Sequence, residues 1–266
     1  MKKQSSRKTE GLTKEQEKIE ESDIDTAKSK KTLTKKAKDT NKKTKTLKKK
    51  EIDLLKYEKE LYKQGIKFIC GVDEVGRGPL VGPVVAAAVI LPINYHLDGL
   101  NDSKKLSEKK REELYPKIIK DAICYGVGMI DAATIDEVNI YEATKLAMYE
   151  AINSLKIKPE HVLIDAMKLE MLDIPSTSII KGDAKSEAIA AASIIAKVTR
   201  DRMMIELSKK FPEYGFEKHK GYPTKAHIEN VKKYGLLDNY RFTFRPISDL
   251  IKQGGKFERE IRKTNN

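Results

Sequence analysis

The order of the predicted strands and helices along this chain indicates its fold class. Strands rich in β-branched and apolar residues are expected over 66–73, 83–91, 123–130, 161–165 and 177–181. Helices are expected within 103–120, with Ser103 as a candidate N-cap, over 140–156 and over 185–209. Because the first strands come together and the later ones alternate with helices, the sequence predicts an α/β fold with a mixed β-sheet flanked by helices.

The first 50 residues differ in composition from the rest of the chain. They hold 18 Lys or Arg and 8 Asp or Glu, a net charge of +10 out of the +13 of all 266 residues, and they contain no aromatic residue. Such a segment buries too little apolar surface to offset its loss of conformational entropy, so we expect residues 1–50 to be a disordered basic tail. A basic tail suits binding to a polyanion, although solubility alone would also account for it.

A short linking helix is expected between this tail and the rest of the chain. Within 51–63, Leu54, Tyr57 and Leu61 recur at helical spacing. The remaining residues, 64–266, suffice for a single domain, for which we expect a helical C-terminal region.

The two cysteines and the distribution of apolar residues indicate where the protein works. Cys70 and Cys124 lie in apolar segments, and neither has a second Cys or a His at the spacing of a metal site, so we expect buried, reduced thiols in a cytoplasmic protein. No run of 18 uncharged apolar residues occurs, which argues against insertion into a membrane. No long amphipathic face is left over once the core helices are placed, so we expect a monomer; the sequence indicates no protein partner.

Four acids lie at or just beyond the ends of predicted strands. Asp73 and Glu74 come at the end of the first strand, Asp165 closes "HVLID", and Asp183 follows "TSIIKG" directly before the alanine-rich helix. In α/β sheets, ligands bind in the crevice beyond the strand ends. Each acid taken singly has an alternative role as a helix N-cap or a solvated strand end, but together the four predict one site.

A group of carboxylates without His or Cys favours the hard divalent ions Mg²⁺ or Mn²⁺, which relieve the repulsion between the acids. Two such ions ~4 Å apart can activate a water and stabilise the leaving oxygen of a phosphodiester. One geometric condition applies. Successive residues of a strand face opposite ways, so Asp73 and Glu74 share a site only if the strand ends or twists there.

A glycine–arginine–glycine triplet, Gly76, Arg77 and Gly78, follows these two acids. Glycines let the backbone approach a ligand closely or adopt positive φ, and an arginine between them can bind a phosphate. Backbone groups this close can also hydrogen-bond a ribose 2′-hydroxyl, the group by which a protein distinguishes RNA from DNA. A plain glycine turn remains the alternative for the triplet by itself.

Five segments together resemble the ribonuclease HII family, in the family's order over residues 71–227: "GVDEVGRGPLVGPVVAAAVILP", "NDSKKLS", "LIDA", "KGDAKSEAIAAASIIAKVTRD" and "HKGYPTKAH". The resemblance implies a ribonuclease H-like fold for the catalytic domain, 64–266. It also implies cleavage of the RNA strand of RNA/DNA hybrids, and cleavage on the 5′ side of a single ribonucleotide embedded in duplex DNA. The implied chemistry is hydrolysis with two divalent ions, Mg²⁺ or Mn²⁺, that leaves a 3′-hydroxyl and a 5′-phosphate.

The resemblance also implies roles for individual residues. By position, Asp73, Glu74, Asp165 and Asp183 match the four catalytic, metal-binding acids of the family. Gly76, Arg77 and Gly78 match the motif that contacts the ribonucleotide at an RNA–DNA junction, and Tyr222 matches the tyrosine that packs on the following deoxyribose. We further expect phosphate contacts from Lys104, Lys105, Lys185 and Ser186. A solvated helix start accounts for these lysines nearly as well, and a lone tyrosine is more often a core or surface residue.

Two other functions stay open at this point, and one related family is disfavoured. Ribonuclease HIII is disfavoured, because its N-terminal extension is a folded domain and its motif lacks the glycine–arginine–glycine triplet. A nuclease of the same fold that acts on DNA alone would cut an all-DNA duplex as well as a hybrid. A nucleic-acid-binding protein with structural acids would lose salt-dependent binding when residues 1–50 are removed, and it would yield no metal-dependent product.

Overall fold

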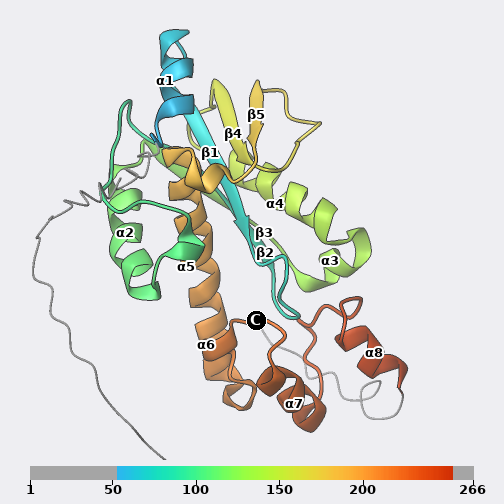
Figure 1. Cartoon of the computed structure of the whole chain (residues 1–266). Coiled ribbons are helices and arrows are strands. Elements are labelled where there is room, and N and C mark those ends of the chain that lie inside the picture. The colour runs from blue at the N-terminus through green and yellow to red at the C-terminus, as the bar shows by residue number, and fades with distance from the viewer. Residues whose placement is uncertain (1–52, 254–266) are drawn as a thin grey trace, which may run out of the picture. The chain divides into compact units, whose positions relative to one another are not determined.

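A five-stranded mixed β-sheet forms the centre of the protein in the computed structural model, which describes residues 53–253 (Figure 1). The strands are β1 (Ile69–Val75), β2 (Val84–Ile90), β3 (Cys124–Ile130), β4 (His161–Asp165) and β5 (Ser176–Ile179). Each lies where the sequence predicts a strand, which confirms the α/β fold with a mixed sheet. The predicted basic tail, 1–50, falls outside the described residues.

Strand β1 occupies the middle of the sheet, whose order is β3-β2-β1-β4-β5. It pairs antiparallel with β2 on one side and parallel with β4 on the other, and β5 continues the parallel half. The first three strands of the chain, β1, β2 and β3, thus form the antiparallel half, and β1, β4 and β5 form the parallel half. Side chains at the end of β1 therefore lie next to those at the end of β4.

One face of the sheet is covered by α5 (Glu187–Lys210) and α2 (Glu108–Asp121). The first turns of α5 are rich in alanine, which brings the helix backbone close to β1. A Cβ placed on Gly71 of β1 would lie only 2.1 Å from the carbonyl carbon of Ala188. The small residues on both partners therefore set the distance between this helix and the central strand.

The opposite face is covered by α3 (Ala132–Val138) and α4 (Ile140–Asn153), which pack on alternate residues of the strands. α4 was predicted, but α3 was not. Only Asn139 separates the two helices; it adopts a positive φ of 71° and accepts N–H bonds from the first turn of α4. A break of one residue between two helical patterns leaves little trace in the sequence.

The start of the helix predicted within 103–120 differs from expectation. The segment begins with a 3-10 turn, η1 (Ser103–Lys105), whose N-cap is Asp102, and α2 then starts with Ser107 as its N-cap. Ser103 is therefore not an N-cap. Pro116 lies inside α2 without ending the helix.

A helical C-terminal region follows α5, as the sequence predicted. It comprises η3 (Pro212–Tyr214), α6 (Phe216–His219), α7 (Lys225–Tyr234) and α8 (Ile247–Lys252). These short elements surround a buried aromatic cluster in which the rings of Tyr214 and Phe216 stack with centroids 5.3 Å apart. Figure 1 shows this region beyond the far end of α5.

Helix α1 (Lys56–Lys63) lies within the predicted linking segment, and its apolar residues pack against a small cluster around Ile69 and Ile189. Cys70 and Cys124 are both buried free thiols. Among the helices within residues 53–253, none combines the length and the apolar character needed to cross a lipid bilayer.

Candidate active site

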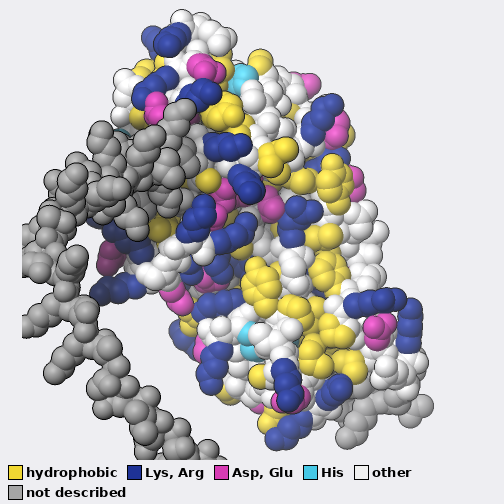
Figure 2. All heavy atoms as spheres, in the orientation of Figure 1, with side chains coloured by type: hydrophobic (Ala, Val, Ile, Leu, Met, Phe, Trp, Pro, Cys, Tyr) yellow, Lys and Arg dark blue, Asp and Glu magenta, His cyan; other side chains and the backbone are white. Residues whose placement is uncertain are grey.

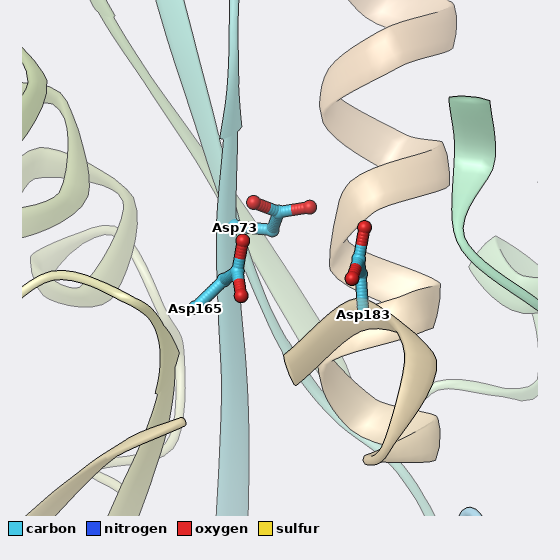
Figure 3. Close-up of side chains that lie close together, drawn as sticks. All are labelled: Asp73, Asp165 and Asp183. Carbon is cyan, nitrogen blue, oxygen red and sulfur yellow. The ribbon is translucent and has the colours of Figure 1, made fainter. Parts of the chain in front are cut away.

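Three carboxylates from distant parts of the chain meet at the end of β4. Asp73 comes from β1, Asp165 is the last residue of β4, and Asp183 lies in η2 (Gly182–Ala184), the 3-10 turn before α5. Each offers an oxygen within 4.8 Å of an oxygen of the other two. Figure 3 shows the three side chains converging on one point. The structure thus brings together three of the four acids that the sequence singled out.

The sheet register explains why two of these acids are neighbours. β1 and β4 run parallel with Val72 opposite Ile164, so Asp73 and Asp165 follow at adjacent positions. Val72 belongs to the core on the α4 face, and by alternation the side chain of Asp73 points to the α5 face. The turn η2 reaches the same face, where the N–H of Gly182 donates to Oδ1 of Asp165 at 2.6 Å.

The three acids repel one another in a poorly solvated place. Asp73 is 2% exposed and Asp183 is 6% exposed. Burial, then the charges of Glu74 and Asp165, raise the pKa of Asp73 well above its usual value. Burial, followed by Asp102 and Asp165, raises the pKa of Asp183 to about 6. The site therefore holds negative charge that a cation would stabilise.

The donor set of this site fits a hard divalent cation. Every candidate ligand atom is a carboxylate oxygen, the kind of ligand that Mg²⁺, Mn²⁺ and Ca²⁺ prefer, and no His or Cys belongs to the group. Asp73, Asp165 and Asp183 would hold such an ion. A divalent cation would also offset the burial and the repulsion between acids that together raise the pKa values of Asp73 and Asp183.

Glu74 lies outside this group of three. β1 continues through Asp73 and Glu74 to Val75, so the strand does not end between the two acids, and Glu74 is not among the three carboxylates whose oxygens lie within 4.8 Å of one another. The Glu74 carboxylate instead lies 3.5 Å from the guanidinium of Arg77. Burial raises the pKa of Glu74 and Arg77 lowers it, while the charge of Asp165 also raises it, which places Glu74 at the margin of the site.

Lys104 provides positive charge to the acids. Partial burial by itself would lower its pKa, but the carboxylates of Asp73, Asp183, Glu74 and Asp102 together raise it. The residue is exposed, so its ammonium group can contact both the acids and a phosphate from solvent. This position suits the phosphate contact predicted for Lys104.

Asp102 is a further acid at the site that we did not predict. Its carboxylate lies beside that of Asp183, so the protonated form of Asp183 can donate a hydrogen bond to Asp102, and this interaction raises the pKa of Asp183 after the larger effect of burial. Burial alone would raise the pKa of Asp102, but the N–H of Lys104, the bond to Asp183 and the charge of Lys105 lower it. The available signal was its place beside two lysines in "NDSKKLS", where we considered only the basic residues.

The loop that carries the glycine–arginine–glycine triplet is held by Arg241, which is fully buried. Its guanidinium donates to the carbonyl oxygens of Gly76 (2.6 Å), Arg77 (3.0 Å), Pro79 (2.9 Å) and Gly82 (2.8 and 3.0 Å). A single side chain therefore fixes the orientation of four peptide carbonyl groups within the loop. Sequence reasoning missed it, because an arginine in a polar segment gives no sign of being buried.

Arg200 supports the same loop from α5. It is fully buried and donates to the carbonyl oxygens of Val81, Pro83 and Lys220. Burial lowers the pKa of Arg200 to about 10 and that of Arg241 to about 9, so both guanidinium groups stay charged at neutral pH. The sequence around Arg200, "KVTRDR", gives no sign that this one charged side chain is buried.

The two glycines of the triplet have different surroundings. Gly76 has a φ of 93°, and a Cβ there would lie 2.4 Å from Nε of Arg200. A Cβ on Gly78 would meet only the ring of Tyr222, at 3.5 Å. Gly76 therefore allows the loop to pack closely on the buried side chain of Arg200. Gly78 lies at the protein surface, next to the exposed ring of Tyr222. Arg77 between them has a side chain 43% exposed.

The backbone of Tyr222 is held in place by a buried histidine, His227. Its ring side is exposed, with 39% of the residue accessible, while its carbonyl oxygen lies 2.9 Å from Nδ1 of His227. A carbonyl can only accept, so Nδ1 of His227 donates and Nε2 accepts from the hydroxyl of Tyr240 at 2.7 Å. Burial lowers the pKa of His227 to about 4, which keeps this tautomer neutral.

The remaining residues predicted to bind substrate differ in their exposure to solvent. Lys105 is exposed and lies 3.5 Å from Asp102, and Lys185 is exposed and donates to the carbonyl of Ile180. Ser186 is fully buried; its hydroxyl donates to Glu58 and accepts from the N–H of Ile189. The prediction that Ser186 contacts a phosphate is wrong, because its hydroxyl is the N-cap of α5 and does not reach the surface.

The surface around the site carries mixed charge. On the face shown in Figure 2, Lys and Arg side chains gather near the middle, beside a few Asp and Glu side chains. Positive charge on a surface attracts the phosphates of a nucleic acid.

Comparison with known proteins agrees with this geometry. The family model described as ribonuclease HII matches residues 70–247. Ribonuclease HII of Bacillus cytotoxicus is 64% identical over 189 residues, which cover 71% of this chain and 73% of that protein. Ribonuclease HII of Bacillus cereus is 60% identical over 190 residues, with 71% and 74% covered.

Solved structures show the same fold. The crystal structure of ribonuclease H2 from Pyrococcus horikoshii aligns with a TM-score of 0.61 and 30% identity, covering 70% of this chain and 97% of that one. Ribonuclease HII in a complex with PCNA from Archaeoglobus fulgidus aligns with a TM-score of 0.53 and 32% identity, covering 62% and 87%. The fold is therefore ribonuclease H-like, and the chain belongs to the ribonuclease HII family of metal-dependent endoribonucleases, which act on RNA/DNA hybrids.

Proposed function

We propose that this enzyme cuts on the 5′ side of single ribonucleotides embedded in duplex DNA, as well as within RNA/DNA hybrids. The observation that carries the proposal is that Gly78, shortly after the strand that bears Asp73, lies beside the ring of Tyr222, so that a Cβ at this position would be 3.5 Å from the ring. A surface formed by glycine backbone and an exposed aromatic ring can distinguish a sugar with a 2′-hydroxyl from one without it.

The loop presents hydrogen-bond donors to such a sugar. Arg241 occupies the carbonyl oxygens of Gly76 and Arg77 from the protein interior. Within residues 53–253, the N–H groups of Arg77 and Gly78 form no hydrogen bond with the protein. These donors can bind the 2′-hydroxyl or the adjacent phosphate, and the half-exposed guanidinium of Arg77 can bind a phosphate oxygen.

The ring of Tyr222 would pack on the sugar that follows the ribonucleotide. A 2′-hydroxyl on that second sugar would press against the ring, so a deoxyribose fits better. The carbonyl oxygen of Tyr222 is hydrogen-bonded to His227, and this bond fixes the distance between the Tyr222 ring and the loop of Gly76, Arg77 and Gly78. The pairing of a donor-lined loop with a packed ring supports a preference for RNA–DNA junctions.

The acids supply the hydrolytic part of the proposal. Asp73, Asp165 and Asp183 would hold divalent ions, and Glu74 at the margin of the site would complete a second set of oxygen ligands. Two bound ions activate a water and stabilise the leaving 3′-oxygen of a phosphodiester. Lys104 is close enough to these acids to balance the charge of the scissile phosphate. The expected products carry a 3′-hydroxyl and a 5′-phosphate, with Mg²⁺ or Mn²⁺ as the ions.

The test is strand-specific cleavage of a labelled DNA duplex with one ribonucleotide, in the presence of Mg²⁺, of Mn²⁺ or of a chelator. A metal-dependent cut on the 5′ side of the ribonucleotide supports the proposal. Cleavage of a long RNA/DNA hybrid without cleavage of this duplex would contradict the junction part and leave the acids in place. Equal cleavage of an all-DNA duplex would favour a DNA nuclease instead.

The monomeric state and the cytoplasmic location remain predictions from the sequence. Sedimentation measures the first, since a mass twice that of the 30.1 kDa chain would contradict it.

A further inference from the structure

Helix α1 buries a single side chain, and that side chain is an acid. Glu58 is 2% exposed, whereas the apolar residues of the helix are only partly buried. A carboxylate loses hydration when it is buried, so such a group is expected to have specific partners. The helix precedes residues 70–247, which match the family model, so Glu58 lies outside the matched residues.

The partners of Glu58 lie at the first turn of α5. Its Oε1 accepts from the hydroxyl of Ser186 at 2.6 Å and from the N–H of Ala188 at 3.2 Å. The N–H of Glu187 donates to the carbonyl oxygen of Leu54 at 3.0 Å. The N–H of Ile189 donates to the hydroxyl of Ser186. The first N–H groups of a helix have no partner within the helix, and here the segment before β1 supplies two of the three.

This helix start is continuous with the turn that carries Asp183. The N–H groups of Lys185 and Ser186 both donate to the carbonyl oxygen of Gly182 at 2.8 Å. The N–H of Gly182 donates in turn to Asp165. The turn is thus held at one end by a second acid of the site and at the other end by Ser186, whose hydroxyl is bonded to Glu58.

We propose that Glu58 is a positioning residue for the divalent-metal site, which it orients through Ser186 and the turn of Asp183. The inference rests on the metal-binding part of the proposed function. Without the bond from Glu58, the Ser186 hydroxyl and the Ala188 N–H lose their acceptor in a place that water does not reach. The turn then relaxes, and Asp183 no longer lies in register with Asp73 and Asp165.

Contacts beyond the metal ligands commonly change metal affinity by about 10- to 100-fold when they are removed. We therefore expect Glu58→Ala to raise the Mn²⁺ dissociation constant of the full-length protein by about 10-fold or more. Glu58→Gln should stay near the wild-type value, since its amide oxygen still accepts both bonds. Glu60→Ala is the matched control: Glu60 lies on the same helix and is exposed.

The experiment is calorimetric titration with Mn²⁺ at a temperature where circular dichroism shows each variant to be folded. A purely structural role would lower the unfolding temperature of Glu58→Ala and leave the Mn²⁺ dissociation constant unchanged, which would overturn the proposal. A loss in Glu58→Gln as large as in Glu58→Ala would also overturn it, because hydrogen bonding would then not be the route.

Glu58→Asp decides the matter if the alanine variant does not fold. It withdraws the carboxylate by one carbon without a change in charge, and a raised dissociation constant supports the proposal whereas an unchanged one overturns it. If the wild-type protein itself binds no Mn²⁺, the metal-dependent function and this inference both fail. If the wild type binds Mn²⁺ and the folded Glu58→Ala binds it equally well, only this inference fails.

Discussion

The guanidinium of Arg241 donates a hydrogen bond of 3.0 Å to the carbonyl oxygen of Arg77, from 164 residues further along the chain. The exposed arginine of the triplet is therefore oriented by a buried one. The conformation of the loop at residues 76–78 therefore depends on the C-terminal region as well as on its glycines.

Arg241→Lys should lower cleavage at a single ribonucleotide by ~10²-fold, the cost typical of a displacement of about 1 Å at a reacting site. A lysine has three rotatable donors on a point charge and cannot reproduce the planar set of bonds made by the guanidinium. The measurement is kcat/KM on the duplex with one ribonucleotide. Arg245→Lys is the control, because Arg245 has a side chain that is 85% exposed. A wild-type rate for Arg241→Lys would contradict the role of this side chain.

The same substitution should lower stability at one glycine of the triplet and leave it nearly unchanged at the other. Gly76→Ala places a Cβ 2.4 Å from Nε of Arg200 at a φ of 93°, so we expect a loss of about 1–3 kcal/mol in the free energy of unfolding. Gly78→Ala meets only the Tyr222 ring at 3.5 Å and should change that free energy by less than about 0.5 kcal/mol. Urea unfolding of both variants measures the contrast, and equal losses would argue against it.

Asp73→Asn should abolish metal-dependent cleavage and leave the protein folded. Stabilisation by bound metal ions amounts to several kcal/mol at the transition state, so the rate should fall by at least about 10²-fold. The substitution also replaces a carboxyl group whose pKa is raised by burial and then by the charges of Glu74 and Asp165, so thermal unfolding in chelator should not shift to a lower temperature. A variant that cuts at the wild-type rate shows that Asp73 is not a ligand.

Mn²⁺ binding should weaken as the pH falls through about 6. Asp183 has its pKa raised to about 6, so in the metal-free protein it holds its proton below that pH and releases it above. Metal must displace this proton, so the affinity is full above the raised pKa and declines below it. Titration calorimetry in two buffers of different ionisation enthalpy measures both the affinity and the released proton. An affinity that stays constant from above to below pH 6 would contradict the assignment of Asp183.

The sequence predicted the sheet and the acids of the site better than it predicted the buried residues that hold the site in place. Strand positions follow from local apolar patterns, and Asp73, Asp165 and Asp183 were found because each lies at the end of such a pattern. Glu74 shows the limit of that reasoning. Whether it joins the same site depends on where β1 ends, and β1 continues to Val75 because β2 pairs with it that far.

The residues that we missed share one property: their partners are distant in sequence. Arg200 and Arg241 bond to carbonyl oxygens of the loop more than 110 residues earlier, and Glu58 bonds to Ser186, 128 residues later. A local pattern carries no sign of such bonds. Ser186 was misassigned for the same reason, since its position after Asp183 suggested a substrate contact while its real partner comes from α1.

The bond between Arg241 and the triplet has a consequence for biosynthesis. The acids Asp73, Asp165 and Asp183 and the loop at Gly76 all leave the ribosome before the residue that fixes the loop. An incomplete nascent chain can therefore assemble the carboxylates while its recognition loop is still unshaped. If the loop selects a ribonucleotide as proposed, chains that end before Arg241 are expected to lack that selectivity.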